Sequence, residues 1–467
     1  MYRNSYDMER LTAFVSEHLN DDTTRLVMNR AKWPKIDMDL AVNCIESRRK
    51  LKGKVQEWYD EPGLVFPRKL SAEQCSSSAT GIYKADLAAR ICGVTNDAIK
   101  DTTVEMFKYS DKGASEVAFK LADLTGGLGV DSWFFSQKAE QVLYCEMLPE
   151  LCMAAQHNYK TLKAENILVR NAAVISETQI AQQELSEMQI AQQVSSEDKG
   201  QNAESVSVFQ TPTQILADYQ PDIVYMDPAR RGEGGKKVFL IEDCTPDVLT
   251  LKDEIFQHTR HILLKLSPMA DITMVCERLG KCCREVHVVA AGGECKELLI
   301  WMDREWNNDY MIHAVELHKG ADAGVFSFTT AQEKNAVKAM VDGNTFLFEP
   351  GKSLMKAGAF NLISERFEIS KLGNSTHYYT FDNNEKAEVL KQHGKVFRIL
   401  RMQPLDKRTI KAAGKEFPKA EVTARNIPMD TDTLRKKLGV TSGDDAHIFG
   451  LKSDTAGMLL LICSVIR

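Results

Sequence analysis

The sequence predicts an α/β fold in which a largely parallel sheet, covered by helices on both faces, lies between an N-terminal helical region and a small C-terminal α+β region. Two observations predict this arrangement. From residue 117 onward, short apolar runs alternate with helix-length segments, which is typical of parallel strands joined by crossover helices. Before residue 110, apolar residues recur at three- and four-residue spacing, as in MERLTAFVSEHL, which indicates helices.

The predicted sheet has five strands before residue 270 and three after it. The first five are residues 117–124, 141–147, 166–173, 221–229 and 261–268, with a helix over 149–164. Residues 285–293, 296–303 and 309–317 are expected to complete the sheet, which then ends near residue 320. Residues 177–207 carry the near-duplicates ETQIAQQELS and EMQIAQQVSS and are expected to form a mobile surface insertion.

Length and composition predict several domains in a reducing compartment. The 467 residues exceed one typical domain, and the segments above divide them into 1–110, 111–320, 321–390 and 391–467. The N-terminus lacks an apolar signal core, and no apolar run approaches the roughly 20 residues of a membrane span, so a cytoplasmic location is expected. The 11 cysteines are scattered and lack zinc-ligand spacing, so no metal is expected.

Charge is distributed unevenly along the chain. The net charge is −6, yet residues 391–437 hold thirteen Lys and Arg against five Asp and Glu, a local +8. Such a segment is either a solvated helical face or a surface that binds a polyanion.

The stretch LADLTGGLGV turns a predicted strand sharply into a helix. Glycines at 126, 127 and 129 allow a tight turn and a close approach of the backbone to a ligand, although such a turn can also be only a turn. In an open parallel sheet, ligands bind beyond the carboxyl ends of the strands. Glu146 and Asn171 end the next two predicted strands, so a carboxylate for a ribose and an amide for an adenine edge stand near the turn.

In order and strand position, DLTGGLG, Glu146, Asn171 and DPAR resemble the class I S-adenosylmethionine-dependent methyltransferases over about residues 117–318. The resemblance implies a Rossmann-like sheet and S-adenosylmethionine as cofactor. Carried over by position, it places the ribose at Glu146 and the adenine at Asn171. The implied cofactor-binding residues are Asp123, Thr125, Gly126, Gly127, Gly129, Glu146 and Asn171.

The fourth-strand motif suggests the acceptor. Methyltransferases that act on amines of bases carry an Asp or Asn, two prolines and an aromatic residue there, and the carboxylate orients the amine while the ring stacks on the base. This chain keeps Asp227 and Pro228 but has Ala229 and Arg230, so Arg230 either stacks on the base or, with Arg231, grips a phosphate. A uracil-C5 methyltransferase is disfavoured because ILLKLSP lacks the nucleophilic cysteine.

The C-terminal part has a second resemblance. FLFEPGKSLMKAGAF and the segments that follow it look like the ferredoxin-like and THUMP-like appendages of a bacterial methyltransferase family, which implies binding of structured RNA such as rRNA or tRNA. The candidate RNA-facing residues are Lys407, Arg408, Lys411, Arg425, Arg435, Lys436 and Lys437. Tyr83 and Lys84, in SSSATGIYKADL, are further candidates because a polar loop there could fold over cofactor or base.

Together these patterns predict an S-adenosylmethionine-dependent RNA methyltransferase that acts on a base nitrogen. Two alternatives remain. A nicotinamide-dependent oxidoreductase on the same fold is disfavoured because Ser132 occupies the third glycine position of the dinucleotide fingerprint. A noncatalytic RNA-binding protein that retains the fold is compatible with the altered DPAR motif.

Overall fold

The computed structural model describes residues 5–94, 118–181, 208–230, 240–339 and 344–466. These residues form two compact units. The first contains the described residues up to 284 together with 299–308, and the second contains 285–298 and the described residues from 309 onward. Each unit joins parts of several predicted domains, whose boundaries remain a prediction.

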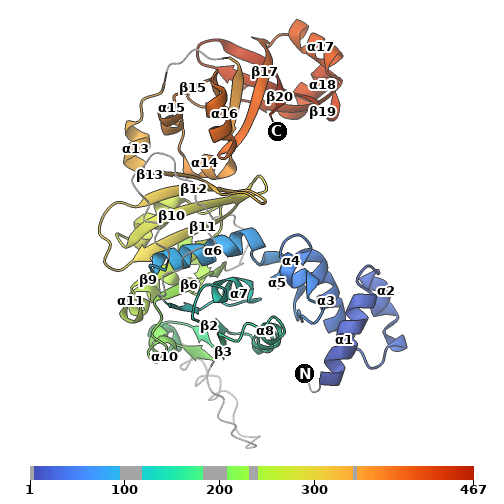
Figure 1. Ribbon diagram of the computed structural model, residues 1–467, viewed down its shortest axis with the longest axis vertical. Helices are drawn as coiled ribbons and strands as arrows, with labels where there is room; N and C mark the ends of the chain where they lie inside the picture. The colour runs from blue at the N-terminus through green and yellow to red at the C-terminus, as the bar shows by residue number, and fades with distance from the viewer. Residues whose placement is uncertain (1–4, 95–117, 182–207, 231–239, 340–343, 467) are drawn as a thin grey trace, which may run out of the picture. The chain divides into compact units, whose positions relative to one another are not determined.

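The first unit opens with short helices, as predicted (Figure 1). Their starts are set by side-chain caps: Asp22, Asp37 and Ser77 each accept a hydrogen bond from a backbone amide of the first turn. The helices are α1 (Ser5–Glu17), α2 (Thr23–Met28), the 3₁₀ turn η1 (Arg30–Lys32), α3 (Met38–Leu51), α4 (Gln56–Asp60), α5 (Lys69–Gln74) and α6 (Ser78–Ile91).

The sheet of the first unit confirms the predicted parallel arrangement. Its strands lie in the order β3-β2-β1-β6-β9, with β11 (Glu294–Asp303) next to β9, and the five are joined by parallel pairings. They are β1 (Lys120–Asp123), β2 (Gln141–Glu146), β3 (Ile167–Asn171), β6 (Ile223–Met226) and β9 (His261–Leu266). In register, Asp123 pairs with Tyr144 and Tyr225, and Glu146 pairs with Asn171, so the carboxyl ends of these strands share one edge.

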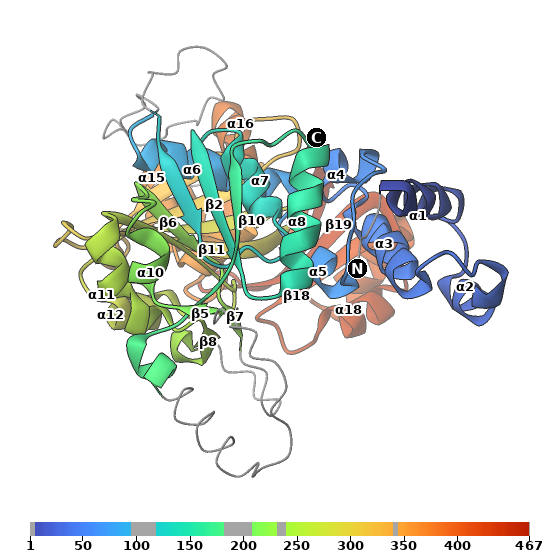
Figure 2. The ribbon, with the colours of Figure 1, turned by 90° about the horizontal axis from the view of Figure 1, so that it is seen from below.

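Helices follow the strands of this sheet, and Figure 2 shows α7 and α8 packed along β2. They are α7 (Val130–Ser136), α8 (Pro149–Thr161), α10 (Pro212–Leu216), α11 (Val248–His258) and α12 (Ile272–Leu279), with the 3₁₀ turn η2 (Ile241–Asp243). The unit also has two small two-stranded sheets. In one, β4 (Ala173–Val174) pairs in parallel with β5 (Phe209–Gln210), and in the other, β7 (Ala229–Arg230) pairs antiparallel with β8 (Cys244–Thr245). Of the predicted insertion, residues 182–207 lie outside the described residues.

The N-terminal helices are tied to α8 by the segment that follows α4. The side chain of Asn158 is fully buried. It accepts a hydrogen bond from the amide of Val65 at 2.8 Å and donates one to the carbonyl of Val65 at 2.9 Å. His157 contacts the carbonyl of Gly63 at 2.9 Å. These bonds satisfy backbone groups that would otherwise be buried without partners.

In the second unit, β10 (Cys283–Ala291) and β12 (Met311–Leu317) pair in parallel, and β13 (Gly324–Phe328) pairs antiparallel with β12. The predicted end of the sheet near residue 320 is therefore wrong. The run GVFSF is short and opens with glycine, so its sequence alone is a weak strand signal. Residues 324–328 form a strand because they pair with the buried strand β12.

The rest of the second unit is a seven-stranded sheet in the order β15-β16-β14-β17-β20-β19-β18. The strands are β14 (Phe346–Pro350), β15 (Ser370–Lys371), β16 (Tyr379–Phe381), β17 (Gly394–Pro404), β18 (Lys419–Arg425), β19 (Thr441–Ser453) and β20 (Gly457–Val465). The helices are α13 (Thr330–Asn335), α14 (Lys352–Ala357), α15 (Asn361–Phe367), α16 (Asn384–Lys391), α17 (Lys407–Glu416) and α18 (Thr431–Leu438).

Helices α17 and α18 cover one face of this sheet. Ile410 of α17 and Leu434 of α18 belong to the same buried cluster as Ile462 of β20, whereas Leu461 belongs to a separate cluster on the opposite face. The two helices approach closely at Gly414, where a Cβ atom would lie 1.7 Å from the carbonyl oxygen of Leu438. No helix in the described ranges has the length and apolar character that a membrane span requires.

Candidate active site

The turn between β1 and α7 is shaped by three glycines with different roles. A Cβ on Gly126 would lie 2.2 Å from the ring of Tyr144, and one on Gly129, at φ +89°, would lie 2.2 Å from the hydroxyl of Tyr159. At Gly127, with φ +55°, the nearest atom to such a Cβ is a backbone oxygen at 3.8 Å. Packing therefore requires the outer two glycines, and the open side of the turn is at Gly127.

Glu146, at the end of β2, is fixed beside this turn. One carboxylate oxygen accepts the amide hydrogen of Gly127 at 3.0 Å, and the other accepts that of Leu148 at 2.8 Å. A carboxylate offers about four acceptor positions, so each oxygen retains one for a ligand hydroxyl. The side chain is half-buried, which leaves it accessible from one side.

Asn171, at the end of β3, has its amide nitrogen engaged. That nitrogen donates to the carbonyls of Glu146 at 2.8 Å and Met147 at 3.1 Å, so the amide oxygen is the atom that can accept from a ligand. The side chain of Met147 is 49% exposed between these two polar residues. An exposed methionine directly after the acidic residue is a signal that the sequence analysis did not use.

Asp123 and Thr125 connect the glycine turn to the end of β6. The buried carboxylate of Asp123 accepts from the hydroxyl of Ser132 at 2.6 Å and the amide of Thr125 at 3.0 Å, and burial raises its pKa to about 7. The hydroxyl of Thr125 accepts the amide hydrogen of Asp227 at 2.6 Å. The glycine turn and the loop after β6 are therefore joined directly.

Asp227 is paired with a lysine from the next strand. Nζ of Lys265, on β9, lies 2.5 Å from one carboxylate oxygen of Asp227, whose side chain is 38% exposed. Pro228 is buried, and the backbone of Arg230 pairs with Cys244 in the β7–β8 ladder. Arg231 lies outside the described residues.

A largely buried carboxylate that the sequence analysis missed lies close to this pair, and its side chain is 12% exposed. Asp131, on α7, accepts from the hydroxyls of Ser76 at 3.0 Å and Tyr225 at 2.8 Å. Its oxygens lie 3.4 Å from Nζ of Lys84 and 3.8 Å from Nζ of Lys265. Burial by itself raises the pKa of Asp131, but the two ammonium groups and the two hydroxyls outweigh it and hold that pKa below its usual range.

This cluster explains where Tyr83 and Lys84 lie. Both belong to α6 and are buried, and the side chain of Lys84 has no exposed surface. Nζ of Lys84 also donates to the hydroxyl of Ser76 at 3.0 Å. Lys84 therefore joins α6 to α7, and the contact of Tyr83 and Lys84 with RNA stays a prediction.

The seven predicted C-terminal basic residues lie on α17, on α18 and at the end of β18. Arg435 is half-buried and lies 3.4 Å from Asp432 and 3.7 Å from Glu421. The remaining side chains are exposed: Lys407, Arg408, Lys411, Arg425, Lys436 and Lys437. The five on the two helices belong to elements that pack side by side, and we call Lys407, Arg408, Lys411, Lys436 and Lys437 the basic face.

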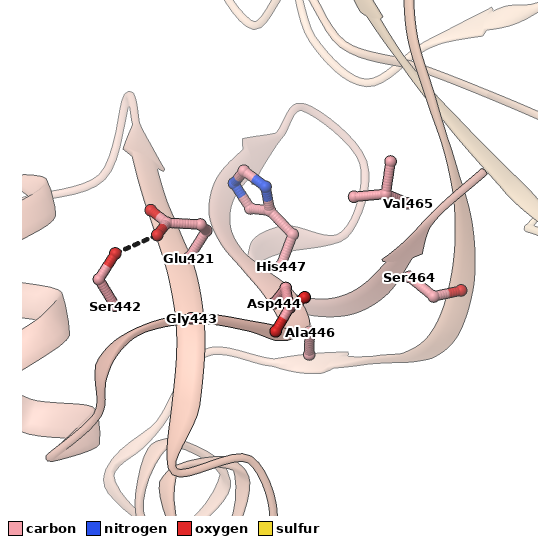
Figure 3. Close-up of a pocket in the computed structure, with 8 residues that line it drawn as sticks. All are labelled: Glu421, Ser442, Gly443, Asp444, Ala446, His447, Ser464 and Val465. Carbon is pink, nitrogen blue, oxygen red and sulfur yellow. Dashed lines mark hydrogen bonds between the residues drawn. The ribbon is translucent and has the colours of Figure 1, made fainter. Parts of the chain in front are cut away.

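A separate pocket of about 520 Å³ opens at the irregular pairing of β18 with β19 (Figure 3). Glu421 and Asp444 line it, and the hydroxyl of Ser442 donates to Glu421. The ring of His447 stacks on Phe449 at 4.0 Å, and burial lowers the pKa of His447 to about 4. Two carboxylates and a neutral imidazole do not suit a phosphate, so this pocket differs in chemistry from the basic face.

Comparison with known proteins agrees with this architecture. Residues 346–387 match the family model of a ferredoxin-like domain, and residues 394–464 match that of a THUMP-like domain. A crystal structure of a protein from Porphyromonas gingivalis W83, provisionally named a methyltransferase, is 25% identical over 100% of both chains, with a TM-score of 0.76. The chain thus combines a class I methyltransferase fold with ferredoxin-like and THUMP-like domains at the C-terminus.

Two other matches overlay only weakly. A Streptococcus mutans protein named a methyltransferase, solved with SAH, is 11% identical over 40% of this chain and 88% of its own, with a TM-score of 0.23. A Clostridium thermocellum protein provisionally named an rRNA-methylase is 10% identical, with the same coverage and TM-score. At these TM-scores the overlays support no inference about this chain. No curated protein matches the sequence.

The Lys84–Asp131 pair generates a prediction about stability. Replacing Lys84 by Ala is expected to lower the free energy of unfolding by about 3–5 kcal/mol, because the largely buried carboxylate of Asp131 loses a partner. Lys138→Ala is the matched control: Lys138 pairs with Asp86 of α6 at 3.0 Å, but both side chains are substantially exposed, at 47% and 34%. Such surface pairs contribute about 0–1 kcal/mol. Urea denaturation of both variants measures the difference, and equal losses would contradict the role given to Asp131.

The sign of the pH dependence follows from the same cluster. Because the pKa of Asp131 in the folded protein lies below the ordinary value of 3.8, its stabilising contribution is present above that value. It is lost as the pH falls through the folded pKa. Lys84→Ala should therefore flatten this acid branch of the stability curve, whereas Lys138→Ala should leave it unchanged.

Proposed function

We propose that the protein transfers a methyl group from S-adenosylmethionine to a base nitrogen of structured RNA. The observation that carries the proposal is the hydrogen bond of 2.6 Å between the amide of Asp227 and the hydroxyl of Thr125. It joins the turn beside Glu146, where a nucleoside fits, to a strand-end carboxylate that can orient an acceptor.

The residues around the glycine turn fit the cofactor. The two remaining acceptor positions of Glu146 suit the two hydroxyls of a ribose, and the open side of Gly127 leaves room for the ligand beside the backbone. The amide oxygen of Asn171 can accept from the amino group of adenine, and the exposed Met147 offers an apolar surface for the ring. S-adenosylmethionine would supply an electrophilic methyl group on its sulfonium.

Asp227 is proposed to orient the target nitrogen. Nζ of Lys265 contacts one carboxylate oxygen of Asp227 at 2.5 Å, so the other oxygen is the one that can accept a hydrogen from the amine. This orients the nitrogen lone pair for in-line attack and provides an acceptor for the proton that the nitrogen loses. In place of the family's aromatic residue, Arg230 is proposed to stack on the base or to bind a phosphate.

RNA binding is proposed for the THUMP-like domain, with the basic face as the phosphate-contacting surface. Its five cations are exposed on two packed helices, which suits contact with a phosphate backbone more than the reading of individual bases. Arg435 is better interpreted as part of the ion-pair network with Asp432 and Glu421.

A noncatalytic RNA-binding protein is a second candidate, and the Asp227–Lys265 pair favours it. A carboxylate already neutralised by a lysine is a weaker acceptor for an amine. The two candidates differ in whether any methyl group is transferred.

The first prediction tests the cofactor. Glu146→Ala is expected to weaken S-adenosylmethionine binding by about 1.5–3 kcal/mol, the usual contribution of hydrogen bonds to a charged group. Glu150→Ala, on the exposed start of α8, is the control and should bind normally. Isothermal titration calorimetry with S-adenosylmethionine and with NAD measures both variants, and thermal melting verifies that they fold. Unchanged affinity in folded Glu146→Ala would remove Glu146 from the site, and preferential binding of NAD would favour an oxidoreductase.

The second prediction concerns transfer. Asp227→Ala should lower the turnover number by about a hundredfold or more with little change in RNA affinity, because the orienting interaction matters mainly in the transition state. Asp227→Asn should retain more activity, since an amide oxygen can also accept from the amine. Transfer of labelled methyl groups to rRNA and tRNA from a strain lacking the gene provides the measurement. Full activity in Asp227→Ala would contradict the assignment, and inactivity of the unmodified protein would favour the noncatalytic candidate.

The third prediction concerns RNA docking. Replacing Lys411, Lys436 and Lys437 by Ala should weaken RNA binding and reduce the slope of log affinity against log salt by about one unit or less for each lost phosphate contact. The control replaces three exposed lysines elsewhere, with the same change in net charge: Lys281, Lys319 and Lys334. Fluorescence anisotropy at several salt concentrations measures both. Equal slopes for the two triple variants would identify the basic face as an ordinary solvated surface.

A further inference from the structure

Two histidines and a glutamate meet in the interior of the second unit. Glu285 and His287 lie two residues apart on β10, so they face the same side of the strand. In the parallel pairing with β12, His287 lies directly opposite His313. All three residues are buried, with exposed fractions of 7%, 1% and 2% in that order.

The three side chains bring their ligand atoms close together, and the rings of His287 and His313 stack with centroids 4.5 Å apart and an interplanar angle of 18°. Oε2 of Glu285 lies 2.9 Å from Nε2 of His287 and 3.4 Å from Nε2 of His313. All the ligand atoms of the group lie within 4.8 Å of one another. Ligands held tetrahedrally by Zn²⁺ at about 2.0–2.1 Å stand about 3.4 Å apart, which is similar to the separations from Oε2 of Glu285. Because an imidazole binds a metal in the plane of its ring, one of the two stacked rings must turn for all three ligands to meet one ion.

The orientation of His313 is fixed from behind. Its Nδ1 lies 2.7 Å from the hydroxyl of Ser327 on β13, so Nε2 is the ring atom that faces Glu285. Among the described residues, the buried Nε2 has no hydrogen-bond partner. A buried, unsatisfied ring nitrogen is costly, and a histidine held through its other nitrogen is the usual arrangement at a metal centre.

We propose that Glu285, His287 and His313 bind one divalent transition-metal ion, with Zn²⁺ as the best fit. Two imidazoles and one carboxylate suit Zn²⁺, whereas Mg²⁺ and Ca²⁺ favour ligand sets made entirely of oxygen. Three protein ligands leave the fourth position to water. The ion links β10 to β12 and satisfies Nε2 of His313. Sequence analysis does not reveal this site, because His287 and His313 are 26 residues apart and become neighbours only through strand pairing.

The experiment uses the full chain, stripped with EDTA and dialysed against Zn²⁺. Metal content is measured by inductively coupled plasma mass spectrometry, and affinity by competition with a zinc indicator. We expect one ion per chain that is lost in both Glu285→Gln and His313→Gln. Glu285→Gln is nearly isosteric and can still hydrogen-bond His287, so its folding should be preserved. Ser327→Ala should weaken the affinity by about 10- to 100-fold, because it removes only the orienting contact.

His377→Gln is the control, since His377 is a histidine of the same unit whose ring stacks on Phe360. It should retain the ion. Cobalt substitution separates this site from the 11 cysteines, because thiolate ligands add an intense near-ultraviolet charge-transfer band that imidazole and carboxylate do not. A tetrahedral Co²⁺ spectrum without that band, present in the unmodified protein and absent in folded Glu285→Gln, supports the site. Absence of binding in the unmodified protein, binding that persists in Glu285→Gln, or a thiolate spectrum would overturn it.

Discussion

The candidate active site depends on one largely buried carboxylate. Asp131 lies at the first turn of α7 and receives hydrogen bonds from Ser76, which precedes α6, and from Tyr225, on β6. Lys84 and Lys265 lie nearby from two further elements. Because a buried charge is tolerated only with its partners in place, these elements are held in one arrangement. The glycine turn that precedes α7 is thereby held in place relative to β6 and β9.

Lys265 belongs to this cluster and to the proposed acceptor site. Its ammonium lies 3.8 Å from Asp131 and 2.5 Å from Asp227, so one positive charge is shared by two carboxylates. Asp227, at the accessible end, is therefore linked through Lys265 to the residues that surround Asp131.

Sequence reasoning worked where the signal was local. Alternating apolar runs located the parallel strands, and the register of β1, β2 and β3 brings the glycine turn, Glu146 and Asn171 to one edge, as their strand-end positions predicted. Sequence reasoning failed where the role of a residue depends on tertiary contacts. Lys84 follows serines that are typical of a helix start, and only the packing of α6 on α7 shows that it is buried against Asp131.

The same distinction applies in the second unit. The excess of positive charge in residues 391–437 could be read from the sequence. That Arg435, unlike the exposed lysines beside it, is held in an ion pair could not, because it depends on which side of α18 faces Glu421. Likewise, a cysteine-based search for metal ligands passes over histidines that occur singly. Glu285, His287 and His313 form a group only because β10 and β12 pair in this register.

The close approach of α17 to α18 at Gly414 has a consequence for selectivity. With the backbone of one helix against that of the other, neither can slide or rotate without opening the core beneath. The lysines of the two helices therefore project from a rigid platform, and the distances between their attachment points are constant. A polyanion whose phosphates match that spacing can be bound with less ordering of the flexible lysine side chains than one of equal charge and different pitch. Under the proposed function, this surface would distinguish nucleic acids by the shape of their backbone.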